Sequence, residues 1–305
     1  MCNKKRMKKV LITGGTGAVG THLTEMLIAK GYEVVMLSRK AGMKNGVRLY
    51  EWNPSKGAID IAAFYNVNHV IHLAGAGIAD HRWTDSYKKE IYDSRIQSTQ
   101  LLVNTIISNK LMLDSFVSTS AIGLYGNDVN GVADENYPVA STFLAKVCND
   151  WETEANKVIP FGIRTVLVRV GVVLAKDSGF IPEVAKPIRL FAGAALGNGK
   201  QMLSWIHMED LCNIYIKAIE DSCMAGPYNA VAPNPASNLD ITRKMAVKLN
   251  RPLLLPAVPL FALRLLFGEV AATLVANQKV SCRKIQEKGF TFSYPTLELA
   301  LNNLL

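Results

Sequence analysis

The sequence predicts an α/β protein built on a doubly wound parallel sheet, with a smaller C-terminal region. Over the first ~170 residues, short β-branched runs alternate with helical patterns, which is typical of a parallel α/β sheet. Of the 305 residues, 49 % are apolar and 19 % are charged. That composition can bury a large core and leaves little room for a long disordered segment.

The expected elements follow one another along the chain without internal repeats. Strands are expected at residues 9–13, 33–37, 69–73, 115–118 and 164–170, and helices at about 19–30, 84–108 and 140–157. After residue 171 comes a stretch with Gly and Pro, followed by a strand at 202–206, a helix at about 208–221 and a helix-rich C-terminus.

Charge and cysteine usage exclude several classes of protein. The net charge is +9, but five basic residues crowd into the first nine positions, so the rest carries only about +4 and we expect no nucleic-acid partner. The five cysteines are scattered and lack a C-x-x-C pair, which argues against a disulfide framework or a zinc site. We therefore expect a reducing, cytoplasmic setting and no metal.

No segment predicts a membrane partner. The apolar run after the basic N-terminus is only Val10-Leu11-Ile12, too short for a signal peptide. The most apolar window, residues 253–276, contains prolines and places Arg264 and Glu269 inside it. Because such charges are costly in a bilayer, we interpret the window as amphipathic helix packed on the core or capping a cleft.

A glycine loop directly follows the first expected strand and opens the first expected helix. Residues 13–20 read TGGTGAVG, so Gly14, Gly17 and Gly20 occur at the spacing of a dinucleotide-binding loop. Glycine allows the tight turn and the approach of a pyrophosphate to the helix N-terminus, where Ala18 and Val19 would also contact it. The alternative is a glycine-rich turn with no ligand. A Walker-type phosphate loop is not available.

The end of the second strand bears on which dinucleotide binds. An NAD site usually has Asp or Glu there, whereas this strand ends in Leu37-Ser38-Arg39-Lys40. A hydroxyl at Ser38 and a guanidinium at Arg39 fit a 2′-phosphate, so we predict NADP(H). The other interpretation is that Arg39 and Lys40 are solvated charges at a strand end.

These features together predict a Rossmann-type organisation in two parts. Residues 1–170 would form the dinucleotide-binding domain, with the helix at 207–222 packing back onto it. Residues 171–305 would form a smaller substrate-side region that includes the helical C-terminal segment.

Beyond these features, motifs along nearly the whole chain resemble the extended short-chain dehydrogenase/reductase superfamily. Within it, they resemble the atypical epimerase family that ends in a C-terminal domain of unknown function. The motifs include the glycine loop, Leu73-Ala74-Gly75, Trp151-Glu152, Ser204-Trp205-Ile206-His207 and Gly289-Phe290.

The resemblance implies further cofactor contacts. Leu73 and Ala74 would lie against the ribose or pyrophosphate, Glu90 and Arg95 would face the cofactor, and Val173 would approach the nicotinamide end. For Glu90 and Arg95 the alternative is an exposed, ion-paired helix face. At the expected junction of strand and helix, His207 and Asp210 are interpreted as capping residues.

The superfamily's catalytic Tyr-x-x-x-Lys pair is missing. None of the ten tyrosines has a lysine four residues later, and the corresponding positions hold Phe143 or Leu144 and Val147 or Cys148. Because lysine lowers the pKa of the tyrosine in that pair, the usual proton donor is absent.

By the resemblance, Ser120 matches the serine that polarises a substrate carbonyl or hydroxyl, and Tyr125 is the nearby phenol that could act as an acid. An aromatic residue there is more often a pocket wall. Arg82 and Trp83 could line the same cleft, or belong to a solvated loop. Two functions stay open: an NADP(H)-dependent oxidoreductase or epimerase-like enzyme with an unknown small-molecule substrate, and a non-catalytic NADPH-binding regulator or scaffold.

Overall fold

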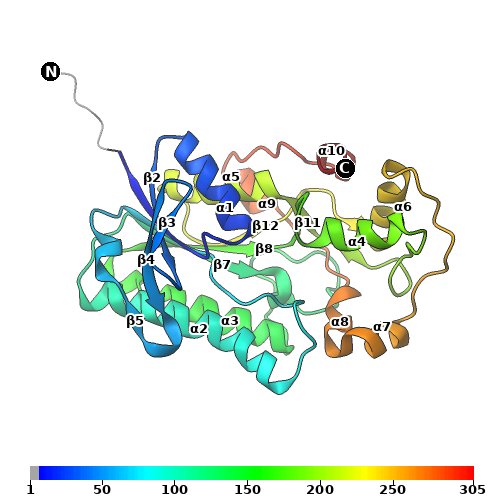
Figure 1. Ribbon diagram of the computed structural model, residues 1–305, viewed down its shortest axis with the longest axis horizontal. Coiled ribbons are helices and arrows are strands. Elements are labelled where there is room, and N and C mark those ends of the chain that lie inside the picture. The colour runs from blue at the N-terminus through cyan, green and yellow to red at the C-terminus, as the bar shows by residue number, and fades with distance from the viewer. Residues whose placement is uncertain (1–6) are drawn as a thin grey trace.

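The computed structural model describes residues 7–305, so Lys4, Lys5 and Arg6 of the basic N-terminal cluster lie outside the described residues. One large sheet organises the chain (Figure 1). Its strands are β1 (Lys9–Thr13), β2 (Glu33–Ser38), β3 (Gly42–Lys44), β4 (Val47–Asn53), β5 (Ala58–Ile59), β6 (His69–His72), β7 (Ser115–Ala121), β8 (Arg164–Val170) and β12 (Gly226–Ala230).

The strand order is β12-β8-β7-β6-β1-β2-β4-β3, with β5 paired to β4. Every pair from β12 to β4 is parallel, and only β3 and β5 run antiparallel to β4. The chain therefore adds β2 and β4 on one side of β1 and then returns to add β6, β7 and β8 on the other side. This reversal of strand order at β1 is the switch point of a doubly wound sheet. The α/β prediction is confirmed.

Two helix pairs cover the faces of this sheet. On one face α1 (Ala18–Ala29) packs against α5 (Met208–Glu220), and on the other α2 (Asp85–Ser108) packs against α3 (Phe143–Asn156). Side chains of β1 alternate between the two cores: Val10 and Ile12 lie with the α1 and α5 residues, and Leu11 lies with those of α2. Burial on both faces explains why this strand is continuously apolar.

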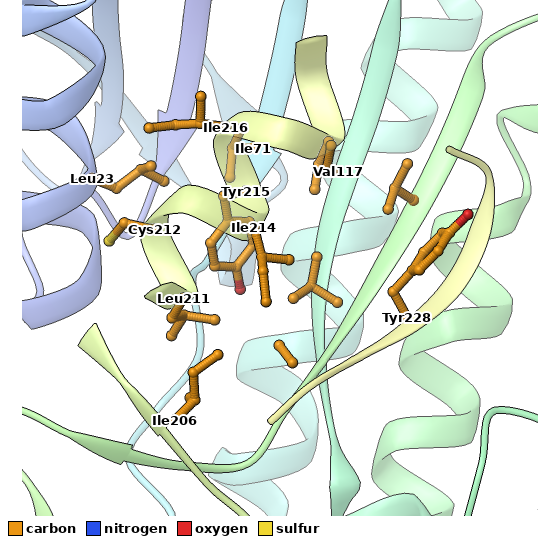
Figure 2. Packing of buried hydrophobic residues seen from close by; sticks show 14 of the residues in the cluster. Leu23, Ile71, Val117, Ile206, Leu211, Cys212, Ile214, Tyr215, Ile216 and Tyr228 are labelled. Carbon is orange, nitrogen blue, oxygen red and sulfur yellow. The ribbon is translucent and has the colours of Figure 1, made fainter. Parts of the chain in front are cut away.

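The core on the α1 and α5 side is closely packed (Figure 2). Leu23 of α1 and Leu211 and Tyr215 of α5 lie over Ile71 of β6 and Val117 of β7, all of them buried. The helix after β11 thus packs back on the sheet that the first 170 residues build.

The remaining elements form a smaller region at one end of the sheet (Figure 1). Its short strands pair as β9 (Val172–Leu174) with β11 (Trp205–His207), and β10 (Met202–Leu203) with β13 (Ala236–Ser237). Its helices are α4 (Phe180–Arg189), α6 (Asn238–Lys248), α7 (Leu260–Phe267), α8 (Ala271–Leu274) and α10 (Leu297–Leu304), with the 3₁₀ turn η5 (Gly268–Val270) between α7 and α8. The exception is α9 (Arg283–Glu287), which packs against β12 of the large sheet.

Two expected elements need correction. The strand expected at 202–206 is divided into β10 and β11, because the chain changes partner at Ser204, from β13 in antiparallel pairing to β9 in parallel pairing. The Ser204 side chain donates to Gln278 O and accepts from Val280 N, each at 2.9 Å. The helix expected from residue 140 begins at Phe143, because the Thr142 hydroxyl caps it by accepting from Ala145 N at 3.2 Å.

Residues 7–305 offer neither a membrane-spanning helix nor a metal-binding cluster. No helix in this range is both long enough and apolar enough to cross a bilayer. The same residues contain no group of three His, Cys, Asp or Glu side chains placed to bind a metal ion.

Candidate functional site

The glycine loop joins β1 to α1 at the carboxyl edge of the sheet. Gly14 has φ of +67°, and a Cβ there would lie 2.9 Å from Ala74 N. A Cβ on Gly20 would lie 2.3 Å from Gly14 O and 2.5 Å from the Gly15 Cα. These distances exclude a side chain at both positions, which is the steric reason for glycine.

The first turn of α1 is open to a ligand. Its N-cap is Gly17, which supplies no side-chain cap, and a Cβ added to Gly17 would meet nothing closer than Gly14 O at 3.4 Å. Ala18 and Val19 begin the helix behind it. A helix N-terminus with uncapped N–H groups and no side chain in front of it fits a phosphate group.

The end of β2 lies beside this loop, because β2 pairs with β1 in parallel register. The Ser38 hydroxyl donates to Lys40 O at 2.6 Å and accepts from Lys40 N at 3.3 Å, so it holds the turn that follows. Arg39 is exposed, and within residues 7–305 no carboxylate oxygen lies within 4.0 Å of its guanidinium. A cation is thus available at this edge.

The end of β6 closes the other side of the loop. Ala74 N donates to the Thr13 hydroxyl at 3.3 Å, and that hydroxyl bonds His72 Nδ1 at 2.6 Å. His72 Nε2 lies 3.0 Å from the Thr99 hydroxyl. Burial, and to a smaller extent Arg95, lowers the pKa of His72 to about 3, so the imidazole is neutral at physiological pH. Leu73 is half-buried at the same edge.

The two predicted cofactor residues of α2 are placed differently from each other. Glu90 is exposed. Arg95 is half-buried and donates to Ile91 O and to Ala76 O, each at 3.0 Å, while its guanidinium lies over the Trp151 ring. Arg95 therefore holds the loop after β6, and direct cofactor contact by either residue stays a prediction.

A cavity of about 540 Å³ lies between the first turn of α1 and the chain that follows β9, the strand that carries Val173. Lys176 and Ser178 line it opposite Gly17 and Thr21. His207, also in its wall, caps α5 by accepting from Glu209 N at 3.2 Å, which confirms its capping role.

Asp210 does not act as a cap in the same way. Its two carboxylate oxygens accept from Ser293 N at 2.8 Å and Tyr294 N at 3.0 Å. This carboxylate therefore attaches the C-terminal segment to α5, a contact that the local sequence around Asp210 does not reveal.

Ser120, near the end of β7, and Tyr125, in the turn that follows, belong to one buried polar network. Ser120 donates to Glu152 at 2.6 Å, and Glu152 accepts two bonds from Arg169 at 2.8 Å each. Tyr125 donates to the Asn229 Oδ1 atom at 2.6 Å and accepts from Arg169 at 3.0 Å. Ser120 is 0 % exposed and Tyr125 is 2 % exposed. Both hydroxyls are thus satisfied within the protein.

The electrostatics of Tyr125 oppose acid catalysis. Burial raises its pKa to about 12, because it outweighs the favourable charge and hydrogen bond of Arg169. A proton donor for neutral pH needs a pKa shifted the other way. The catalytic assignment of Ser120 and Tyr125 stays a prediction, and their contacts favour a structural role.

The positions where the resemblance would place the catalytic pair lie in α3. Val147 and Cys148 are buried, and burial raises the pKa of the Cys148 thiol to about 11. Lys146 is exposed and pairs with Asp150 at 2.6 Å. Neither group is arranged to assist a phenol.

A second cavity, of about 530 Å³, separates α3 from the α7 to α8 segment. Trp83 and Phe143 line one wall. Their rings pack edge to face with centroids 5.3 Å apart. Arg264 and Thr273 line the other, and Thr142 also contributes. A cleft with aromatic walls, a few hydroxyls and a guanidinium has the composition of a small-molecule site.

Gln278 ties the C-terminal region to the turn that follows β7. Its side-chain amide donates to two carbonyl oxygens that flank the 3₁₀ turn η3 (Ile122–Tyr125). One is Ile122 O at 3.1 Å, at the start of the turn, and the other is Gly126 O, just after its end. Its backbone N donates to Met202 O at 2.8 Å. Sequence reasoning missed this residue, because its partners lie far away along the chain.

The fold and the open glycine loop define a dinucleotide-binding protein of the Rossmann type. The chain matches the NAD dependent epimerase/dehydratase family over residues 10–230, and a domain of unknown function, DUF1731, over residues 258–304. It therefore belongs to the epimerase family with that C-terminal domain, as the resemblance indicated.

Relatives share this arrangement over their whole length. The epimerase family protein YfhF of Bacillus subtilis is 34 % identical over 97 % of each chain. The epimerase family protein ML0860 of Mycobacterium leprae is 34 % identical over 99 % of this chain and 97 % of the relative. A crystal structure of the human epimerase family protein SDR39U1 with NADPH has a TM-score of 0.86 at 31 % identity, covering 97 % of this chain and 98 % of the human one.

Proposed function

We propose that this protein is an NADP(H)-dependent oxidoreductase or epimerase-like enzyme acting on a small molecule. The observation that carries the choice of cofactor is the exposed Arg39 at the end of β2, where no carboxylate is present to accept from a ribose hydroxyl. The similar human protein, crystallised with NADPH, supports the same choice.

In this proposal, the chain's own residues bind and orient the cofactor. The uncapped N-terminus of α1 accepts the pyrophosphate, and Arg39 grips the 2′-phosphate by charge-assisted hydrogen bonds. Val173 and the η3 turn adjoin the nicotinamide end. The bound nicotinamide would donate or accept a hydride.

The substrate would occupy the cleft between Trp83, Phe143 and α7. Because Tyr125 is buried with a raised pKa, proton transfer would fall to a group of the substrate or to water positioned in the cleft, and turnover would be slow. A reducing, cytoplasmic location is part of this proposal, and the free Cys148, Cys212, Cys223 and Cys282 are compatible with it.

The cofactor assignment is tested by Arg39→Asp. Loss of a charge-assisted contact of about 1.5–3 kcal/mol weakens NADPH binding roughly 10- to 100-fold and leaves NADH binding nearly unchanged, as measured by calorimetry. Lys44→Asp, an exposed charge change on β3, serves as the matched control. Equal losses for both cofactors in the Arg39 variant would refute the 2′-phosphate contact.

A second candidate is a non-catalytic regulator or scaffold that responds to NADPH. The burial of both candidate catalytic hydroxyls in one hydrogen-bonded network favours it. Purified protein would be screened for NADPH oxidation against carbonyl compounds and nucleotide sugars. Turnover with any of them supports the enzyme, whereas a large NADPH-induced rise in Tm without turnover supports the regulator.

A further inference from the structure

Two segments lie side by side at the end of the molecule farthest from β4 and β5 (Figure 1). Residues 184–208 contain most of α4, and residues 241–268 contain most of α6 and all of α7. α4 packs against α6. The two segments also exchange backbone hydrogen bonds: Val258 N donates to Ala195 O and Gly197 N donates to Val258 O, each at 2.8 Å. They form one continuous surface.

The charge of this surface is predominantly positive, and its acidic neighbours are Glu183 of α4, Asp240 of α6 and Glu269 just after α7. Neither segment contains an aspartate or a glutamate, whereas together they carry eight basic residues: Lys186, Arg189, Lys200, Arg243, Lys244, Lys248, Arg251 and Arg264. All but Arg251 are exposed. Among the described residues only Lys244 of these eight forms an ion pair, with Asp240. The two segments therefore carry a formal charge of +8 between them.

The same surface exposes large apolar side chains. α7 is anchored by the buried Leu263, while Phe261 and Leu265 point outward with 75 % and 77 % of their surface exposed. The loop before α7 and the end of α4 continue this pattern. We call the set the basic apolar face; its exposed apolar members are Leu190, Phe191, Val247, Leu254, Leu255, Phe261, Leu265, Leu266 and Phe267.

We propose that the basic apolar face docks on the surface of an anionic lipid bilayer. Exposed Leu and Phe side chains gain by entering the acyl boundary, and lysine and arginine around them gain from anionic headgroups. Charge complementarity decides against a second copy of this chain, because a symmetric contact would oppose the same eight positive charges. Nucleic acid would match the charge but would leave the aliphatic side chains in water.

This docking places the second cavity near the bilayer. Arg264 and Gly268, which belong to the same segment as the basic apolar face, line that cavity. The proposal departs from the expectation of no membrane partner. That expectation was based on the lack of a predicted signal peptide or membrane-spanning segment in the sequence. It needs neither, since an interfacial helix lies on the membrane without crossing it.

Vesicle co-sedimentation of the full-length protein tests the proposal. We expect binding to phosphatidylcholine vesicles that contain phosphatidylglycerol, weaker binding to phosphatidylcholine alone, and release at high salt. The double variants Phe261→Ser with Leu265→Ser, and Arg243→Gln with Lys248→Gln, each reduce the partition coefficient by about tenfold or more.

Matched controls change similar residues elsewhere on the surface. Ile159→Ser with Phe161→Ser removes two exposed apolar groups, and Lys30→Gln with Lys56→Gln removes two exposed charges. These controls keep wild-type partitioning, and thermal unfolding checks that all variants are folded. No binding to anionic vesicles, equal losses in the controls, or self-association through Phe261 and Leu265 without vesicle binding would each overturn the proposal.

Discussion

Polar groups gather at two places on the carboxyl edge of the sheet, and they are used in opposite ways. Around the glycine loop, the N-terminus of α1 is uncapped and Arg39 is exposed. At the end of β7 and in the η3 turn that follows it, Ser120 and Tyr125 are buried, and their hydroxyls are bound to neighbouring side chains. The first place is arranged to receive a ligand, and the second has its hydrogen-bonding capacity consumed by the fold.

The largest expected effect comes from breaking the buried network. Arg169→Met leaves the Glu152 carboxylate, 9 % exposed, without its bidentate partner, and we expect a loss of about 3–5 kcal/mol in the free energy of unfolding. Urea unfolding measures it. Lys244→Met breaks an exposed pair with Asp240 and costs at most about 1 kcal/mol. Similar losses in both variants would contradict a structural role for the network.

A smaller effect separates the packing and binding functions of the glycine loop. The Cβ of Gly20→Ala collides with the Gly14 carbonyl, so we expect a loss of about 1–3 kcal/mol of stability, measured by urea unfolding. We expect NADPH binding to be weakened in the same variant. Gly17→Ala has room for its Cβ and keeps the stability, but the methyl group obstructs the phosphate and weakens NADPH binding, measured by calorimetry. A loss of stability in Gly17→Ala would show that both glycines are needed for packing.

The buried histidines His69 and His72 predict that the stability of the protein depends on pH. Burial lowers the pKa of His72 to about 3 and that of His69 to about 4, while in the unfolded chain both are near 6.5. The unfolded state therefore binds more protons as pH falls below 6.5, and stability decreases by up to about 1.4 kcal/mol per pH unit for each histidine.

Unfolding free energies of wild type and His72→Asn between pH 7 and 5 test this expectation. The variant removes one of the three histidine titrations that burial shifts downward, those of His69, His72 and His207, so its slope is smaller than that of the wild type. An unchanged slope would mean that His72 is not buried in its neutral form.

The smallest effect concerns the phenol. Tyr125→Phe removes one partner each from Asn229 and Arg169, and we expect a loss of about 1 kcal/mol of stability with unchanged NADPH affinity. The measurements are urea unfolding and calorimetry. Once a substrate is found, a hundredfold fall in kcat at unchanged stability would instead place Tyr125 in the reaction.

Local patterns in the sequence predicted the parts of the fold that depend on neighbouring residues. The apolar run of β1, the glycine loop and the helix after it are recognisable within 20 residues. The β3 and β4 strands were missed because their apolar residues are few or alternate with charges, as in Val47-Arg48-Leu49. β12 was missed because it contains Gly226 and Pro227, which a strand tolerates at the edge of a sheet.

The candidate site was only partly predictable for a related reason. Arg39 follows directly from the residue type at a strand end. The bonding of Ser120 to Glu152, 32 positions away, and of Tyr125 to Asn229, 104 positions away, depends on strand order, which no local pattern contains. The sequence therefore located the hydroxyls of Ser120 and Tyr125 but did not reveal that they are enclosed.

The position of Gln278 limits how this chain can be divided. It lies in a stretch that bonds on one side to the chain after η3, where Val129 N donates to Asn277 O at 2.9 Å, and on the other to Met202 O. Ending the polypeptide before this point would remove a tie from the wall of the cleft as well as the last helices. The two segments matched by the family models are thus joined by backbone hydrogen bonds, and a fragment that ends before Asn277 would lack the contact at Asn127 in the wall of the second cavity.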